Sequence, residues 1–366
     1  MAYAGLGQDW ECLFANDFSE KKAESYALNW GSDHLHVGDV ALLNSTQLPN
    51  HADLAWASFP CQDLSLAGNG AGLDGARSGT FWAFMRLINV LNAEGRKPKI
   101  IAIENVYGAI TSHDGKDFEA MVQIVASLGY RVGAMVIDAI HFVPQSRPRL
   151  FIVAVDAKFA IPDSAIDENP NPGWHPAAII RAYNQLPTEL KSAWIWWNPP
   201  MPKANHKTLD DIIERNPQGV EWNSQEETDR LMNMMSPVNR HKILEAQKSG
   251  RLKVGALYRR TRNGEQRAEV RFDGVSGCLR TPGGGSSRQT IMIINGNNIQ
   301  SRLLSPREAA RLMGLEDTYK LPKRYNDAYH LAGDGVVVPV VSHLAEYVFS
   351  AVIDVNRLLL PLAKAA

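Results

Sequence analysis

Three short polar motifs in the first 150 residues adjoin apolar runs and supply a thiol, a carboxyl group and two guanidinium groups. They are PCQ (60–62) after the run 54–59, ENV (104–106) after 99–103, and QSRPR (145–149) before 150–155. Catalytic groups of open α/β sheets collect where strands meet loops. Each motif taken singly also fits a buried structural cysteine, a solvated loop acid or a surface charge. Together they predict nucleophilic and acid–base chemistry at one sheet edge. We expect Arg147 and Arg149 to face opposite sides of the strand that they open.

A glycine-containing motif and two acids near the N-terminus could bind a nucleotide cofactor. AGLG (4–7) is expected to form a Gly-x-Gly turn between a strand and a helix, where backbone can approach a nucleotide closely. Asp17 follows the apolar run 12–15 and could accept hydrogen bonds from ribose hydroxyls. Asp39, at the next strand end, could accept one from an adenine amino group. These features fit an adenosine-containing cofactor and leave both NAD and S-adenosylmethionine open.

The apolar pattern around these motifs alternates between strand-like and helix-like runs up to about residue 156. Apolar residues recur at helical spacing over 81–91 and 118–128, and 99–103, 131–137 and 150–155 are strand-like. Strand and helix in alternation predict an α/β fold: a parallel, Rossmann-like sheet with helices on both faces. We expect the C-terminal apolar helix to pack back on this domain. The catalytic domain would thus comprise 1–160 and 297–366, with a smaller irregular domain over 161–296.

The smaller predicted domain contains a concentration of positive charge. Residues 240–288 hold twelve Lys/Arg and four Asp/Glu, a balance of +8 in a chain whose formal net charge is −1. Such a block indicates a surface for a polyanion, although a solvated charged loop has the same composition.

The remaining composition is that of a globular protein in a reducing compartment. Apolar residues make up 45% and charged residues 21%, and the three cysteines have no zinc-ligand spacing. The N-terminus lacks the pattern of a signal peptide. The apolar stretch 339–362 is interrupted by four ionisable residues, His343, Glu346, Asp354 and Arg357, which predicts a buried helix rather than a membrane span. We therefore expect a cytoplasmic protein, without a metal or a membrane partner.

The order of the motifs along the chain resembles that of the DNA cytosine-5 methyltransferase family. AGLG, PCQ, ENV and QSRPR are followed by the basic region, then by SPREAARLMG (305–314) and AGDGVVVPV (332–340). The resemblance covers 3–155 and about 274–341. It implies methyl transfer from S-adenosyl-L-methionine to carbon 5 of a cytosine that is flipped out of duplex DNA. The irregular domain would then be the target recognition domain.

The resemblance also implies a catalytic role for four residues. Cys61 would add to carbon 6 of the ring, and Glu104 would contact N3 and the exocyclic amino group. Arg149 would hold the base carbonyl O2. Arg147 would support the catalytic loop and the base pocket.

Further positions match the family's cofactor and DNA motifs. The implied cofactor-binding residues are Tyr3, Gly5, Leu6, Gly7, Asp17, Phe18, Asp39, Val40, Pro60, Asp334 and Val336. The expected DNA-binding residues are Gln62, Ser65, Arg259, Arg260, Arg280, Gly283 and Gly284. We expect a monomer acting on double-stranded DNA. The motifs specify neither a target sequence nor a companion restriction endonuclease.

Two positions depart from the family pattern. Gln8 stands where a second glycine is usual, and only two residues precede Tyr3, which predicts a short first strand. Asp334 replaces the usual asparagine, and an added acid there could weaken binding of the cofactor's carboxylate end. The alternatives are a tRNA cytosine methyltransferase on the same scaffold and a non-catalytic DNA-binding relative. A nicotinamide dehydrogenase is disfavoured, because nothing resembles a hydride-transfer site.

Overall fold

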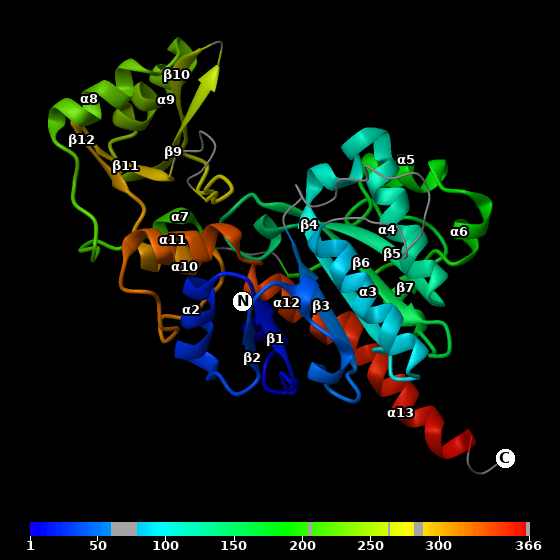
Figure 1. Cartoon of the computed structure of the whole chain (residues 1–366). Coiled ribbons are helices and arrows are strands. Elements are labelled where there is room, and N and C mark those ends of the chain that lie inside the picture. The colour runs from blue at the N-terminus through cyan, green and yellow to red at the C-terminus, as the bar shows by residue number, and fades with distance from the viewer. Residues whose placement is uncertain (60–78, 204–206, 263, 282–287, 364–366) are drawn as a thin grey trace.

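The larger part of the molecule is built on a four-stranded sheet in the order β3-β4-β6-β5 (Figure 1). The computed structural model describes residues 1–59, 79–203, 207–262, 264–281 and 288–363. The four strands are β3 (Leu54–Ser58), β4 (Ile100–Val106), β5 (Tyr130–Asp138) and β6 (Pro148–Asp156). β3 and β4 are parallel, whereas β6 runs antiparallel to both β4 and β5.

The antiparallel strand corrects the expectation of a wholly parallel sheet. Only residues 139–147 connect β5 to β6, including the short helix η7 (Ala139–His141). A parallel crossover needs about a dozen residues or more. The chain therefore turns back beside the strand that it has just left.

Helices cover both faces of this sheet, as the fold-class prediction requires. α3 (Thr80–Ala93), α4 (Lys116–Ser127) and α5 (Ala177–Gln185) pack on one face, where Ile101 and Ile103 of β4 point. α12 (Val338–Leu344), η9 (Ala345–Ser350) and α13 (Ala351–Ala363) continue one another on the other face, where Ile100 and Ala102 point. The alternation follows from the two-residue period of an extended strand. Helices over 81–91 and 118–128 are confirmed.

The C-terminal helix also meets the length and hydropathy of a membrane span. The stretch Tyr325–Leu359 qualifies by composition, yet 61% of its most apolar window is buried inside the protein. Val341, Leu344 and Phe349 are completely buried against the sheet. These contacts agree with a core helix that packs back on the first domain, as the sequence predicts.

The N-terminal segment forms a helix instead of the predicted strand and turn. Residues Ala2–Leu6 make the short helix α1, and Gly7 follows it with φ of 80°. β1 (Ala15–Asp17) and β2 (Leu35–Val37) form a separate parallel pair, with α2 (Glu20–Trp30) between them in the chain. Short 3-10 helices follow at Val40–Leu42, Ser45–Gln47, Tyr107–Ile110, Ser112–Gly115 and Asp163–Ala165.

The smaller part of the molecule contains an antiparallel sheet in the order β10-β9-β11-β12. Two helices, α8 (Gln225–Asn233) and α9 (Pro237–Lys248), lie beside it, and Ile243 of α9 shares a separate apolar core with Leu257 and Met292. The strands are β9 (Lys253–Arg262), β10 (Glu265–Arg271), β11 (Thr290–Asn295) and β12 (Asn298–Leu303).

The packing does not follow the domain boundaries expected at 161 and 296. β7 (Ile166–Asp167), α6 (Thr188–Ser192) and β8 (Trp196–Trp197) lie against the larger sheet. The indole nitrogen of Trp197 donates to the carbonyl of Val153 at 3.0 Å. At the other boundary, β12 completes the smaller sheet. The tryptophan-containing segment around β8 therefore belongs to the larger part, because Trp196 and Trp197 are buried on its sheet.

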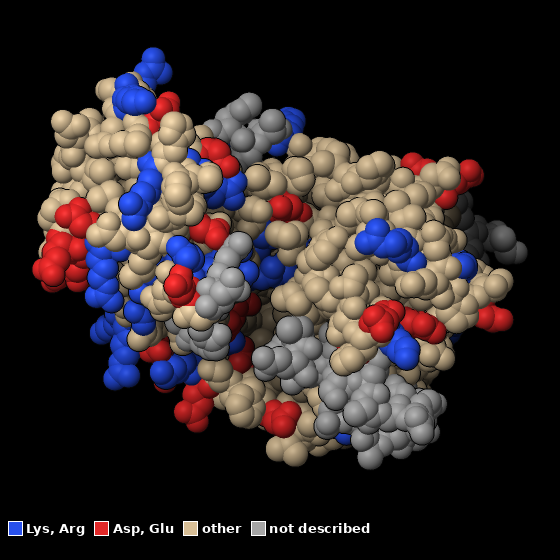
Figure 2. All heavy atoms as spheres, turned by 90° about the horizontal axis from the view of Figure 1, so that it is seen from above, with Lys and Arg blue, Asp and Glu red and all other residues tan. Residues whose placement is uncertain are grey.

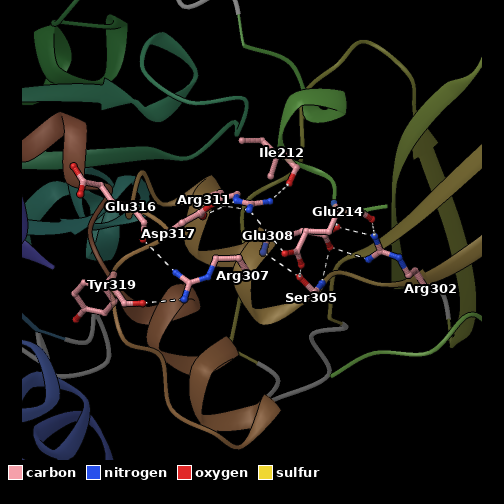
Figure 3. A network of polar contacts seen from close by, with 10 residues as sticks. All are labelled: Ile212, Glu214, Arg302, Ser305, Arg307, Glu308, Arg311, Glu316, Asp317 and Tyr319. Atoms are coloured by element: carbon pink, nitrogen blue, oxygen red, sulfur yellow. Dashed lines mark hydrogen bonds and ion pairs between the residues drawn. The ribbon is translucent and has the colours of Figure 1, made fainter. Parts of the chain in front are cut away.

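A polar network joins the smaller sheet to α10 (Pro306–Leu312), the helix that precedes α11 (Tyr325–Asp334) (Figure 3). Its centre is Arg302 of β12, which is 2.6 Å from Glu308 of α10; both side chains are fully buried. Arg302 also donates to the carbonyl of Glu214, which follows α7 (Leu209–Ile212), at 2.9 Å. Arg311 and Arg307 extend the network to 316–319.

We expect Glu308→Ala to lower the free energy of unfolding by about 3–5 kcal/mol, because it leaves the Arg302 charge buried and unpaired. Asp317→Ala is the matched control, since it removes an Arg311 partner whose side chain is 62% exposed. Its loss should stay within about 1 kcal/mol. Urea denaturation measures both values. Similar losses in the two variants would contradict a dominant role for the buried pair.

Candidate active site

The carboxyl group of Glu104 and the guanidinium group of Arg149 meet at the ends of β4 and β6. Arg149 Nε lies 3.3 Å from Glu104 Oε1. Sheet register explains the meeting, because Arg149 pairs with Val106 across the antiparallel strands and Glu104 pairs with Ser58 of parallel β3. The strand predicted at 99–103 thus extends through the ENV motif itself. Glu104 lies inside β4, two residues before its end.

Glu104 is in an environment that favours a protonated or proton-sharing carboxyl group. Only 7% of the residue is exposed, and this burial raises the pKa of Glu104. The charges of Arg149 and Arg147 and a hydrogen bond with Ser58 act in the opposite direction without cancelling the effect of burial. The carboxyl group can therefore hold a proton at higher pH than a solvated glutamate.

The side chain of Arg147 is buried and binds several backbone carbonyl groups. Its guanidinium group donates to the carbonyls of Leu279 at 2.7 Å and of Gly333 and Gly335 at 2.8 Å. Cys278 Sγ lies 3.2 Å from Arg147 Nη1. Arg147 therefore joins residues 278–281, which lie between β10 and β11 in the sequence, to the AGDG motif near the C-terminus.

The expectation that Arg147 and Arg149 face opposite sides is wrong. Arg149 Nη2 also reaches Cys278 Sγ, at 3.8 Å. Positions i and i+2 of an extended chain point in the same direction, so one intervening proline keeps the two side chains together. Cys278 therefore lies between two guanidinium groups.

The predicted nucleophile lies beyond the described residues, as do Pro60, Gln62, Ser65, Gly283 and Gly284. Cys61 comes shortly after β3, and Phe59 is the last residue described before it. The side-chain amide of Asn105 donates to the carbonyl of Phe59 at 3.2 Å. The chain that leads to Cys61 is thus fixed to the ENV segment one residue after Glu104.

Two of the candidate cofactor carboxylates lie at neighbouring strand ends. Asp17 ends β1 and pairs with Val37 of β2, and Asp39 follows two residues later. Asp17 accepts from the amide of Ser19, and Asp39 accepts from that of Ala41. Phe18, directly after β1, is 79% exposed, which is unusual for a phenyl ring and suits stacking by a planar ligand. Val40, also a candidate, is half-buried in the following turn.

The AGLG segment is packed differently from the predicted glycine turn. A Cβ on Gly5 would lie 2.4 Å from Val341 Cβ, so this glycine serves close packing of α1 on α12. Leu6 joins the apolar core, and Tyr3 packs its ring 4.7 Å from that of Trp30. Of the two glycines in this segment, Gly7 is the one that has a positive φ and open space around it.

The AGDG segment places Gly335 and Asp334 beside this N-terminal region. A Cβ on Gly335 would collide with Met1 Sδ, and Val336 next to it is buried. Asp334 is paired with Lys22 at 2.8 Å. The added acid is therefore compensated within the protein, which removes the physical reason to expect weaker binding of a carboxylate ligand.

The three described candidates for DNA contact are all exposed. Arg259 and Arg260 lie on β9, where Arg260 stacks on the ring of Tyr258, and Arg280 lies beyond the sheet. Figure 2 shows that Lys and Arg side chains on this face gather over the half that holds the smaller sheet. The basic block of the sequence thus forms a surface and not a buried network.

Three residues near the site were missed or given no role by sequence reasoning. Ser58 hydrogen-bonds Glu104, and its position could have been found from the register of two consecutive parallel strands. Gln145 accepts from the amide of Leu279 at 2.9 Å, although it belongs to the QSRPR motif. Cys278 carried no signal, because its contacts depend on chain segments far apart in sequence. Among the described residues no group of His, Cys, Asp and Glu could hold a metal ion.

Comparisons with known proteins agree in one family. A family model described as C-5 cytosine-specific DNA methylase matches residues 2–350. The type II methyltransferase M.HhaI of Haemophilus parahaemolyticus is 26% identical over 92% of this chain and 86% of its own length. M.MspI of Moraxella sp is 24% identical over 96% of this chain and 70% of its own length.

Solved structures share the fold. The S. pombe Dnmt2 methyltransferase has a TM-score of 0.59 at 17% identity, covering 99% of this chain and 94% of that chain. A putative DNA modification methyltransferase from an E. coli prophage has a TM-score of 0.55 at 15% identity, covering 96% and 95%.

Proposed function

The chain belongs to the C-5 cytosine-specific DNA methylase family, and from this premise we propose the details of its reaction. It transfers a methyl group from S-adenosyl-L-methionine to carbon 5 of a cytosine in a specific duplex DNA sequence. The reaction proceeds through a covalent adduct between Cys61 and carbon 6 of the flipped-out base.

The observation that supports this most is the pair formed by the buried carboxyl group of Glu104 and the half-buried guanidinium group of Arg149. Carbon 5 of cytosine is a poor nucleophile until electrons are pushed into the ring. A carboxyl group whose pKa is raised by burial can share its proton with N3, while the adjacent guanidinium group binds the carbonyl O2. Both groups lie at one strand edge, so a single base can contact both.

The atoms of the reaction balance around these residues. The Cys61 thiolate adds to carbon 6, and the N3 side of the ring takes up the electron pair with the help of Glu104. The electron pair then returns from the N3 side to carbon 5, which takes the methyl group as S-adenosyl-L-homocysteine leaves, and the shared proton goes back to Glu104. A base removes the carbon 5 proton, the electron pair of that bond re-forms the double bond between carbons 5 and 6, and the carbon 6–sulfur bond breaks to release the Cys61 thiolate. Arg147 acts on the reaction through position, because its hydrogen bonds hold the segments of Leu279, Gly333 and Gly335 next to the strand that carries Arg149.

The residues at β1 and β2 fit the adenosine end of the cofactor. Asp17 would accept from the ribose hydroxyls, Asp39 with Val40 would lie at the adenine, and the exposed ring of Phe18 would cover its face. Bound there, S-adenosyl-L-methionine supplies an electrophilic methyl group. No atom lies within 4 Å of the place that a side chain on Gly7 would take, so its backbone is open to a ligand, while Val336 and Leu6 provide apolar packing.

Duplex DNA is proposed to bind between this site and the basic surface of the smaller part. A stacked cytosine exposes neither face to a thiol, so it must leave the helix. Arg259, Arg260 and Arg280 would contact phosphates or base edges, with the glycines after Thr281 allowing close backbone approach. We also propose that the protein acts as a cytoplasmic monomer.

If β9 contacts phosphates, Arg259→Ala/Arg260→Ala should reduce the salt dependence of DNA binding. Each neutralised phosphate contributes about −0.9 to the slope of log K against log salt. The double variant should flatten this slope by up to roughly two units. Lys158→Ala/Arg181→Ala removes the same charge from exposed sites on the larger part and should leave the slope unchanged. An unchanged slope in the β9 variant would show that these arginines do not face DNA.

Methylation sequencing tests the proposed function and supplies the target sequence. The protein is expressed in a host without cytosine-5 methylation, and both genomic DNA and total tRNA are sequenced by a method that detects 5-methylcytosine. A methylated sequence motif in the DNA, absent with Cys61→Ser, is the expected result. Methylation confined to tRNA would favour the tRNA methyltransferase alternative. No methylation in either pool would support a non-catalytic relative.

A further inference from the structure

Asp334 contacts two segments that are far apart in the sequence. At the end of α11, its Oδ2 lies 2.8 Å from Lys22 Nζ, while its Oδ1 accepts a hydrogen bond from Thr281 Oγ1. Partial burial opposes ionisation of the carboxyl group, but the hydrogen bonds from Lys22 and Thr281 outweigh it and lower the pKa of Asp334. A single ionised carboxylate therefore joins Lys22 to Thr281 around neutral pH.

The two joined segments belong to the two binding regions. Lys22 lies in the first turn of α2, which begins shortly after Asp17 and Phe18. Thr281 follows Arg280 and immediately precedes residues 282–287, which include the glycines expected to face DNA. The carboxylate of Asp334 thus connects α2, which follows the proposed adenosine-binding residues, to Thr281, which follows the proposed DNA-binding residue Arg280.

The contact between the Asp334 segment and the Thr281 segment is tightly packed. A Cβ on Gly333 would lie 2.9 Å from the amide nitrogen of Thr281, so only glycine permits this approach. Arg147 holds the carbonyls of Leu279, Gly333 and Gly335 at once. Segments 279–281 and 333–335 are therefore held against each other. The Lys22 end is looser, because both side chains of that ion pair are 37% exposed.

We propose that Asp334 is a positioning residue that couples cofactor binding to the placement of Arg280 and Thr281, and through Arg280 to DNA binding. The inference rests on the proposed function. A ligand that orders Asp17 and Phe18 also orders the first turn of α2, and Lys22 then holds Asp334 and Thr281 in one arrangement. Coupling between two ligands is reciprocal, so DNA must strengthen cofactor binding by the same factor.

The test is the ratio of DNA dissociation constants without and with saturating S-adenosylhomocysteine, on the duplex identified by methylation sequencing. For the unaltered protein we expect a ratio of about five or more. Lys22→Met and Thr281→Val each break one contact of Asp334 and should bring the ratio toward one. The matched control is Lys21→Met, which removes an ion pair of 3.0 Å between the same two helices, with Asp327. Its ratio should remain that of the unaltered protein.

A second measurement separates coupling from general damage. S-adenosylhomocysteine binding is titrated with and without DNA, and both ratios must change together in Lys22→Met and Thr281→Val. A merely structural role would weaken each ligand alone and leave the ratio intact, which would overturn the proposal. A ratio of one for an unaltered protein that still methylates DNA would also overturn it, with the proposed function untouched. Failure of that protein to methylate DNA or bind S-adenosylhomocysteine would overturn both.

Discussion

Cys61→Ser is expected to reduce methyl transfer at least about a thousandfold while the affinity for DNA is largely retained. At pH 7 a thiol with a pKa of about 8.5 is a few per cent thiolate, whereas a serine hydroxyl is essentially un-ionised. The substitution changes one atom and leaves the basic surface of the smaller part intact. Transfer of a labelled methyl group to the identified duplex measures activity, and fluorescence anisotropy measures binding.

Cys278→Ser provides the matched control for this prediction. Cys278 lies 3.2 Å from Arg147 and 3.8 Å from Arg149, so it is the described cysteine nearest to the proposed site. A hydroxyl oxygen there still accepts hydrogen bonds from both guanidinium groups, and turnover should change little. Near-normal turnover of Cys61→Ser together with loss in Cys278→Ser would reassign the nucleophile.

The sequence was sufficient for the parts of the site that follow local periodicity. The apolar run 99–103 places Glu104 at the end of a buried strand, and the structure confirms a strand there. The helix predicted over 81–91 is confirmed for the same reason, since one buried face repeats at helical spacing. Such features need only neighbouring residues and the period of the backbone.

The features that the sequence did not predict depend on contacts between distant segments. AGLG reads as a glycine turn, but Gly5 is buried against Val341, more than three hundred residues away, and α1 forms instead. The Lys22–Asp334–Thr281 contacts similarly need three segments brought together by the fold. The tryptophans after Pro162 follow no period in the sequence, yet Trp197 is fully buried on the larger sheet. Tertiary packing, rather than local propensity, decides each of these cases.

DNA that carries 5-fluorocytosine at the target position is expected to capture the protein covalently. Fluorine at carbon 5 cannot leave as a proton, so after methyl transfer the ring has no route back to its double bond. The bond between Cys61 and carbon 6 therefore persists. A protein–DNA species that survives denaturing electrophoresis is the measurement. Its formation should require S-adenosyl-L-methionine and should be absent with Cys61→Ser.

The rate of capture also tests the role of the buried carboxyl group. Glu104→Gln keeps the shape of the side chain and its contact with Ser58, but an amide cannot transfer a proton to N3. Capture should slow by roughly a hundredfold or more, the usual range for loss of an acid–base group. Because burial raises the pKa of Glu104, the unaltered protein should hold this proton further toward neutral pH than a solvated glutamate, and its capture rate should fall as pH rises through that pKa. Methylation of the ordinary target with no trapped species on the fluorinated one would exclude the covalent route.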